Sequence, residues 1–226
     1  MQKSLSSNNW NIWDALIVLA TVVLFRAITR LILGNVSTGL SMGPVLLLEF
    51  LGGSIGLGVI HTYMQHHYYR SSLKINLTME KPWWYVQIAL ISGILMFAVL
   101  TLGYYYLLLL LGVDISSFFA GIRQASGVFN RATVFMAVCI FFPLLTEVVY
   151  RGYLYLAMEK QWGNGVAMLV SSLLFSLFFF NFWLMPPLFF AGIVLVLVYE
   201  MTSSLYTSIF SMMIWQALTM AYINIF

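Results

Sequence analysis

Residues 132–158 read ATVFMAVCIFFPLLTEVVYRGYLYLAM, and this stretch decides the fold class. It is long enough to cross a bilayer as an α-helix, which needs about 20 mostly apolar residues. Its only charged side chains are Glu147 and Arg151. They lie four residues apart with the acid first, the favourable order for a helical ion pair. A structural pair is one interpretation, and a carboxylate kept for chemistry is the other.

The whole chain has the composition of an integral membrane protein. Of its 226 residues, 62% are apolar or aromatic and 8% are charged, and the mean hydropathy is +0.95. A soluble domain carries about 25% charged residues, so a water-facing globule is excluded and the lipid bilayer is the expected solvent. The net charge of +3 is spread over separate loops, which excludes a nucleic-acid footprint.

Apolar runs separated by short polar connections predict an all-α, polytopic transmembrane helical bundle of about seven spans. No repeat divides the chain, so residues 1–226 are expected to form a single integral-membrane domain. The basic residues of the connections favour a cytoplasmic N-terminus. The last run reaches Phe226 without a polar flank, which is compatible with a longer natural chain. The expected spans are 12–33, 42–64, 82–111, 132–158, 166–183, 187–201 and 202–226.

Further ionisable residues fall inside the other apolar runs. A charge at membrane depth costs about 2.5–3.5 kcal/mol on insertion scales, so each one asks for a partner or a function. Arg26 and Arg30 share a helix face. They could pair with Glu49, pair with Glu200, or line a water-filled cavity.

Histidine and cysteine usage points away from a metal site. His61, His66 and His67 lie close together, but no carboxylate or cysteine accompanies them. We expect interfacial or solvated histidines rather than metal ligands. Cys139 is the only cysteine, which excludes an internal disulfide and a cysteine-based metal cage. The sequence thus predicts no metal and no cofactor.

Glycines mark a close-packing face on the second span. Gly52 and Gly56 are four residues apart, so they share a face that a neighbouring backbone can approach closely. Helix packing is the expected role, and the same face is a candidate surface for packing a partner protein. The aromatic segment 178–183 is a second candidate surface, with a core role as the alternative.

Residues 132–216 resemble a known family, the CPBP intramembrane proteases, also called CAAX protease or Abi proteins. The family's first motif is a Glu-Glu pair, then three residues, then Arg-Gly. Glu147, Arg151 and Gly152 match this motif, and Thr146 stands at the first Glu.

The other two family motifs also align in order. The second is a Phe, three residues and a His; Phe175 matches, and Phe179 stands at the His. The third, aligned on residues 202–205, puts Met212 at its His and Gln216 at its Asn. A shift of four residues would instead put Gln216 at the His.

The resemblance implies a CPBP-like fold that lacks the proteolytic activity of the family. In the family, the first Glu and the two His bind and activate the water that attacks the peptide bond. A general base needs a titratable group, which Thr146, Phe179 and Met212 do not supply. The resemblance therefore predicts a pseudoprotease, in which Glu147, Arg151 and Gly152 remain as a structural remnant of the motif.

Three functions follow from these observations. The first is implied by the resemblance, since degenerate members of the family resemble scaffolds: a scaffold or regulator of another membrane-anchored protein, such as a cell-wall enzyme, in the bacterial cytoplasmic membrane. The second is an active CAAX-type intramembrane endopeptidase that uses Glu147, with Glu200 or Glu49 as a second carboxylate. The third is a small-solute transporter or channel whose intramembrane charges line a path.

Overall fold

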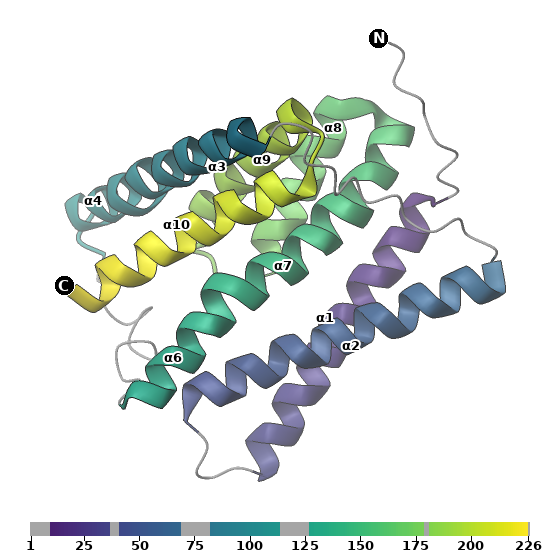
Figure 1. The fold of residues 1–226 in the computed structure, drawn as a ribbon, viewed down its shortest axis with the longest axis horizontal. Coiled ribbons are helices and arrows are strands. Elements are labelled where there is room, and N and C mark those ends of the chain that lie inside the picture. Colours follow the sequence, from purple (N-terminus) through teal and green to yellow (C-terminus); the bar gives the residue numbers. More distant parts are fainter. Residues whose placement is uncertain (1–9, 37–40, 69–81, 114–126, 179–180, 226) are drawn as a thin grey trace.

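The computed structural model describes residues 10–36, 41–68, 82–113, 127–178 and 181–225, and every regular element among them is helical (Figure 1). The label η marks a π-helical stretch. In chain order the elements are α1 (Ile12–Val36), α2 (Met42–Tyr68), α3 (Pro82–Met96), η1 (Phe97–Gly103), α4 (Tyr104–Leu110), α6 (Val128–Met136), η3 (Ala137–Phe141), α7 (Phe142–Glu147), η4 (Val148–Tyr155), α8 (Leu156–Leu177), α9 (Met185–Thr202) and α10 (Leu205–Ile225).

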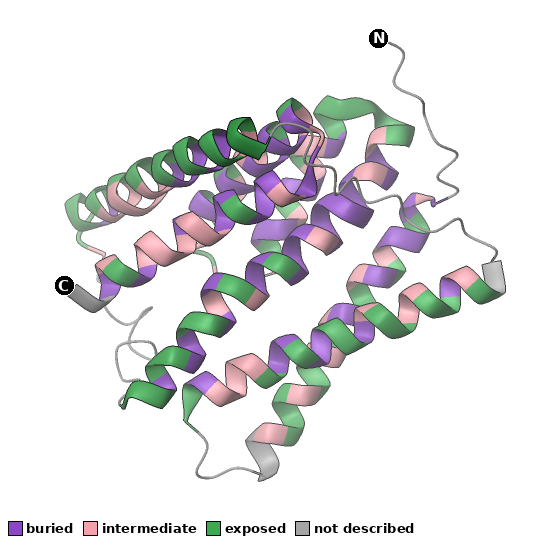
Figure 2. Cartoon of the chain, in the orientation of Figure 1, coloured by how far each residue is buried: buried purple, intermediate pink, exposed green. Residues whose placement is uncertain are grey.

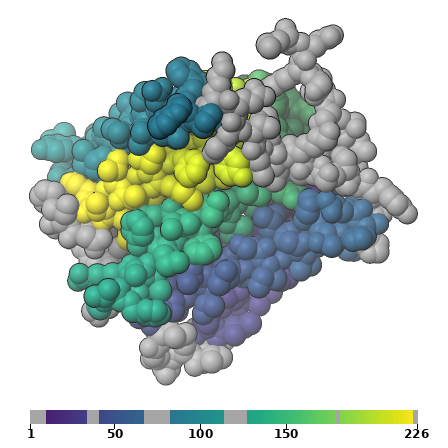
Figure 3. Space-filling model, in the orientation of Figure 1, coloured from purple at the N-terminus to yellow at the C-terminus, as the bar shows by residue number. Residues whose placement is uncertain are grey.

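The helices pack as a bundle in which neighbours in space are often distant in sequence. The last helix, α10, packs on α3 and on the η3–α7 stretch, and α2 packs on α6 and η3. Figure 3 shows these elements as adjoining bands on one face, with α10 between α3 and the α6–α7 rod. The α8–α9 pair lies behind this face, where α8 contacts α1 and α9 contacts α3 (Figure 1). The all-α bundle predicted from the sequence is confirmed.

Five stretches of the described chain are long and apolar enough to span a membrane: residues 12–33, 42–66, 82–110, 128–177 and 185–202. The fourth has 50 residues and contains Gly163, whose φ of 77° is outside the helical region. Tyr150 and Phe175, on either side of Gly163, are in edge-to-face contact at 5.3 Å, so the chain reverses there. This stretch is therefore a hairpin of two rods, and its turn falls between the predicted spans 132–158 and 166–183.

The remaining difference from the expected seven spans concerns α10. Its 21 residues are enough to cross a bilayer, but its Ser, Thr and Gln residues lower its hydropathy. Length and composition alone therefore mark five spans where the sequence predicted about seven.

Burial is concentrated in the hairpin and in α9 and α10 (Figure 2). In the most apolar window, 56% of residues are buried for 128–177 but only 11% for α1. Large apolar side chains cover the outside, such as Leu31, Ile91 and Leu110 at 67%, 68% and 81% exposure. An apolar surface of this extent requires lipid around it. The chain is a multi-pass membrane protein.

Candidate functional site

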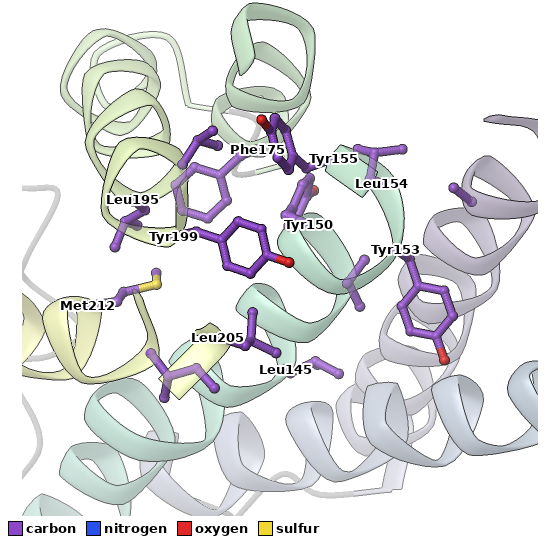
Figure 4. Close-up of a cluster of buried hydrophobic side chains, with 14 of the residues drawn as sticks. Leu145, Tyr150, Tyr153, Leu154, Tyr155, Phe175, Leu195, Tyr199, Leu205 and Met212 are labelled. Atoms are coloured by element: carbon purple, nitrogen blue, oxygen red, sulfur yellow. The ribbon is translucent and has the colours of Figure 1, made fainter. Parts of the chain in front are cut away.

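The predicted motif positions Thr146 and Met212 meet in the bundle core. Thr146 is on α7 and Met212 on α10, and the Thr146 hydroxyl lies 3.6 Å from the Met212 sulfur. The same hydroxyl donates to the Phe142 carbonyl one turn earlier, at 2.7 Å. Met212 is fully buried, within the cluster that also contains Tyr150 and Leu205 (Figure 4). The alignment that pairs positions 146 and 212 therefore has a geometric counterpart.

Gln216 takes a different place from Met212. It lies one turn further along α10 and lines a large cavity rather than the Thr146 contact. The alternative alignment, which puts Gln216 at the position of the motif His, has no corresponding contact with Thr146 among the described residues. Phe179 lies outside the described residues.

The predicted ion pair between Glu147 and Arg151 forms and is completely enclosed. Arg151 Nη1 donates to Glu147 Oε1 at 2.7 Å, and the two side chains are 1% and 0% exposed. Arg151 Nη2 donates to the Gly192 carbonyl of α9 at 2.9 Å. The guanidinium lies over the Phe175 ring of α8 at 5.1 Å. The pair thus links α7, η4, α8 and α9.

Glycine gives this site its close helix spacing. Gly152 is buried within η4, directly after Arg151. At Gly192, an added Cβ would lie 2.8 Å from the Ser172 Cβ, closer than carbon atoms pack. Helices α8 and α9 can therefore approach closely only because residue 192 has no side chain. This approach also brings the Gly192 carbonyl within reach of Arg151.

The structure decides which acid Arg26 and Arg30 meet. Both pair with Glu49 of α2, with N–O distances of 3.7 and 3.4 Å. Glu200, the other candidate, instead accepts hydrogen bonds from the Tyr155 hydroxyl at 3.1 Å and from Asn164 at 3.3 Å.

Arg26, Arg30 and Glu49 also line a cavity of about 620 Å³. Its wall is formed by α1, α2, η1, α4, η3, α7, α9 and α10 together with residues 178, 183 and 184 between α8 and α9. Thr146 and Met212 do not line it, but Gln216 does, so the cavity adjoins the motif site and shares one motif position with it. Sequence reasoning foresaw the arginine-lined cavity as one alternative, but not the aromatic residues that complete it.

His61 is more engaged than the sequence suggested. Its Nδ1 lies 2.6 Å from the Tyr153 hydroxyl and its Nε2 lies 2.9 Å from Gln65 Nε2. The Trp10 ring stacks on the imidazole at 6.3 Å. His61 is therefore half-buried and hydrogen-bonded rather than fully solvated, because Tyr153 of η4 lies beside the end of α2, and its interfacial position stays a prediction. His66 is exposed, and the side chain of His67 lies outside the described residues.

The Gly52–Gly56 face is already occupied within the chain. A Cβ at Gly52 would meet Thr29 and a Cβ at Gly56 would meet Phe25, both residues of α1. The predicted helix packing is correct, but the interpretation as a partner surface is wrong, because α1 fills the face. At Gly58, by contrast, an added Cβ would meet nothing within 4 Å.

The fold and the site define a polytopic, all-α membrane protein with a sealed ion pair at its centre. Residues 128–218 match the family model described as Rce1-like, Type II CAAX prenyl endopeptidase Rce1-like. Residues 128–218 thus form a domain similar to this CAAX prenyl endopeptidase (CPBP) family, which confirms the resemblance seen over 132–216. The family is a family of proteases. Searches of curated proteins and of solved structures returned no match.

Proposed function

We propose that this chain is a catalytically inactive Rce1-like protein that works by binding a second membrane-anchored protein. The contact between Thr146 and Met212 carries the first half of the proposal. By the motif alignment, these positions hold a Glu and a His in the proteases of the family. Here a hydroxyl and a thioether fill the space against each other at 3.6 Å, and the two residues are 2% and 0% exposed.

The remaining carboxylate of the motif also fits a structural role. A general base must come within hydrogen-bond reach of the water that it activates. Glu147 is 0% exposed, and its Oε1 is engaged by Arg151 at 2.7 Å. Neither a peptide bond nor its attacking water reaches this carboxylate without opening the packed core. We therefore assign Glu147 and Arg151 to holding the helices together.

A peptidase assay tests the loss of catalysis. The purified chain is incubated with a prenylated CAAX peptide, beside the double variant Glu147→Gln/Arg151→Gln as matched control. The double variant removes the carboxylate without leaving a buried charge. We expect no cleavage above background from either protein. Cleavage by the wild-type chain that disappears in a folded double variant would refute the proposal and establish the endopeptidase.

The second half of the proposal concerns the partner. We propose a membrane-anchored enzyme of the cell envelope, in a bacterial cytoplasmic membrane, with the N-terminus of this chain on the cytoplasmic side. The apolar outer faces of the bundle support contact with a spanning helix, because transmembrane helices associate through close packing. The Gly52–Gly56 face is not the docking surface, because α1 covers it.

Mild extraction at native expression levels tests the partner. We expect a membrane-anchored protein to co-purify in stoichiometric amount and to be identified by mass spectrometry. Its recovery should persist in the Glu147→Gln/Arg151→Gln variant. Recovery of this chain alone, after crosslinking in intact membranes as well as after mild extraction, would contradict the scaffold function.

An active endopeptidase is the second candidate, and the family match is the observation that favours it. The peptidase assay above separates it from the scaffold. Transport of a small solute remains a third prediction, for which the charged cavity is the relevant feature. A liposome flux assay tests it, with flux abolished by Leu100→Trp as the supporting result.

A further inference from the structure

The cavity beside the motif has the size and lining of a ligand site. Its volume of about 620 Å³ lies in the range of about 300–1,000 Å³ that is typical of small-molecule pockets. The larger part of its wall is apolar, with Leu100, Leu108 and Leu188 among the lining residues. The charged groups lie on α1 and α2, where Arg26 and Arg30 contact Glu49, and uncharged polar side chains such as Thr101 and Gln216 are interspersed along the rest of the wall. The cavity therefore has a charged end and a long apolar wall.

The charged end carries an excess of positive charge. Among the described residues, two guanidinium groups share the Glu49 carboxylate, which leaves one positive charge in excess at this end of the cavity. A guanidinium has five N–H donors, so one shared carboxylate does not use them all. Arg26 is held between the Phe50 and Phe178 rings at 4.7 and 4.6 Å, and its Nε has no hydrogen-bond partner among the described residues. An anion here would gain charge-assisted hydrogen bonds.

The apolar end is built as a rigid wall. Trp215 Nε1 donates to the Thr101 hydroxyl at 3.0 Å and joins α10 to η1. The Tyr104 hydroxyl donates to the Trp183 carbonyl at 2.7 Å and joins α4 to the segment before α9. All four residues line the cavity. A wall tied in this way loses little freedom when a ligand enters, which favours binding.

We propose that this cavity binds a single-chain amphiphile with an anionic head group. Its carboxylate or phosphate lies at Arg26 and Arg30, and its chain lies along the apolar wall formed by η1, α4, α9 and α10. A free inorganic anion would leave this wall uncovered, and a neutral lipid would leave the positive charge unpaired. This inference is independent of the proposed partner, because the cavity is lined by residues of this chain.

Native mass spectrometry of the delipidated protein in neutral detergent tests the charge requirement. The probes are lysophosphatidylglycerol, oleate, lysophosphatidylcholine of the same chain length, and glycerol phosphate, which has no chain. We expect one equivalent of an anionic single-chain probe to bind, with lysophosphatidylcholine about tenfold weaker and glycerol phosphate unbound. The preferred probe distinguishes a phosphate head from a carboxylate head. Equal binding of lysophosphatidylcholine would overturn the proposal.

Two pairs of variants locate the binding. Arg30→Gln removes a charge from a side chain that is 75% exposed, so the fold should tolerate it. We expect about tenfold weaker binding of the anionic probe and unchanged binding of lysophosphatidylcholine. Arg131→Gln, the same change on an exposed residue outside the cavity wall, should leave both unchanged. Anionic binding that is insensitive to Arg30→Gln would also overturn the proposal.

The second pair fills the space for the chain. Leu100→Trp places a bulky ring on the cavity wall, and Leu95→Trp places the same ring on the exposed face of α3, where Leu95 is 54% exposed. We expect Leu100→Trp to abolish binding of every chain-bearing probe and Leu95→Trp to have no effect. Loss of binding in both variants, or in neither, would place the amphiphile outside this cavity.

Discussion

The described part of the chain contains two groups in which an acid meets arginine within the apolar helices, and the two groups differ in how far they are enclosed. Between Glu147 and Arg151 the N–O distance is 2.7 Å and both side chains are at most 1% exposed. Glu49 meets Arg26 and Arg30 at 3.7 and 3.4 Å, and the arginine side chains are 20% and 75% exposed. The first group neutralises itself inside packed helices. The second lies on a cavity and keeps one positive charge in excess.

This difference shows how one kind of residue serves both stability and binding. In an enclosed pair, the attraction between the two charges offsets the cost of removing them from water only while both partners are present. The pair therefore behaves as a structural unit. A group on a cavity wall can exchange partners, because water or a ligand can replace part of its contacts. The functional importance of a charged residue in this membrane protein therefore depends on its surroundings more than on its identity.

Removing one member of the enclosed pair should have the largest effect. Glu147→Gln leaves Arg151 buried without a counter-charge, and we expect a loss of about 3–5 kcal/mol in the free energy of unfolding. Denaturant titration in detergent, together with the abundance of the protein in membranes, measures this loss. The double variant Glu147→Gln/Arg151→Gln should recover much of it. A Glu147→Gln protein as stable as the wild type would contradict the structural role of the pair.

A methyl group at Gly192 should disturb the same pair indirectly. Gly192→Ala brings a Cβ to 2.8 Å from the Ser172 Cβ, so α8 and α9 must separate. We expect a loss of about 1–3 kcal/mol, the usual range for overpacking, because the Gly192 carbonyl also moves away from Arg151. Gly58→Ala is the control, since its Cβ meets nothing within 4 Å. Equal thermal stability of the two variants would mean that the helix contact adjusts without cost.

The free energy of unfolding should change less when the group of Arg26, Arg30 and Glu49 loses a ring contact. Phe178→Leu keeps an apolar side chain but removes the ring that lies 4.6 Å from the Arg26 guanidinium. A cation–π contact contributes about 0.5–2 kcal/mol, and we expect a loss in the free energy of unfolding within this range. Phe182→Leu, on a side chain that is 77% exposed, is the matched control. A decrease in the free energy of unfolding no larger than that of the control would show that the Phe178 ring does not stabilise Arg26.

The smallest effect on stability is expected for Arg30→Gln. Exposed ion pairs contribute about 0–1 kcal/mol, and the Arg30 side chain is 75% exposed. The free energy of unfolding should therefore change by less than about 1 kcal/mol, although ligand binding should change strongly. A loss comparable to that of Glu147→Gln would show that the two groups do not differ in the way described above.

Features that depend on local sequence were predictable. The apolar runs predicted the helical bundle, and the four-residue spacing predicted the Glu147–Arg151 pair. The motif alignment brought Thr146 and Met212 to one place, where the structure also has them.

Features that depend on tertiary position were not predictable in the same way. Arg26 and Arg30 could reach Glu49 or Glu200 as far as the sequence tells, and only the packing of α1 on α2 selects Glu49. The contact of His61 with Tyr153 joins residues 92 positions apart, and no local pattern encodes it. The Gly52 face was recognised as a packing face, but the sequence does not state which helix fills it.

The π-helical stretch η4 (Val148–Tyr155) has a consequence for how the motif is spaced. A π-helix bonds residue i to residue i+5, so the chain accommodates an additional residue compared with an α-helix, and such stretches often accompany functional sites. Deleting one residue from η4 would let the stretch relax to an α-helix while the helices on either side keep their relative orientation. The same deletion from a regular α-helix would turn everything beyond it by about 100°. Relatives that differ here by a single insertion or deletion should therefore be aligned by turns of the helix rather than by residue count.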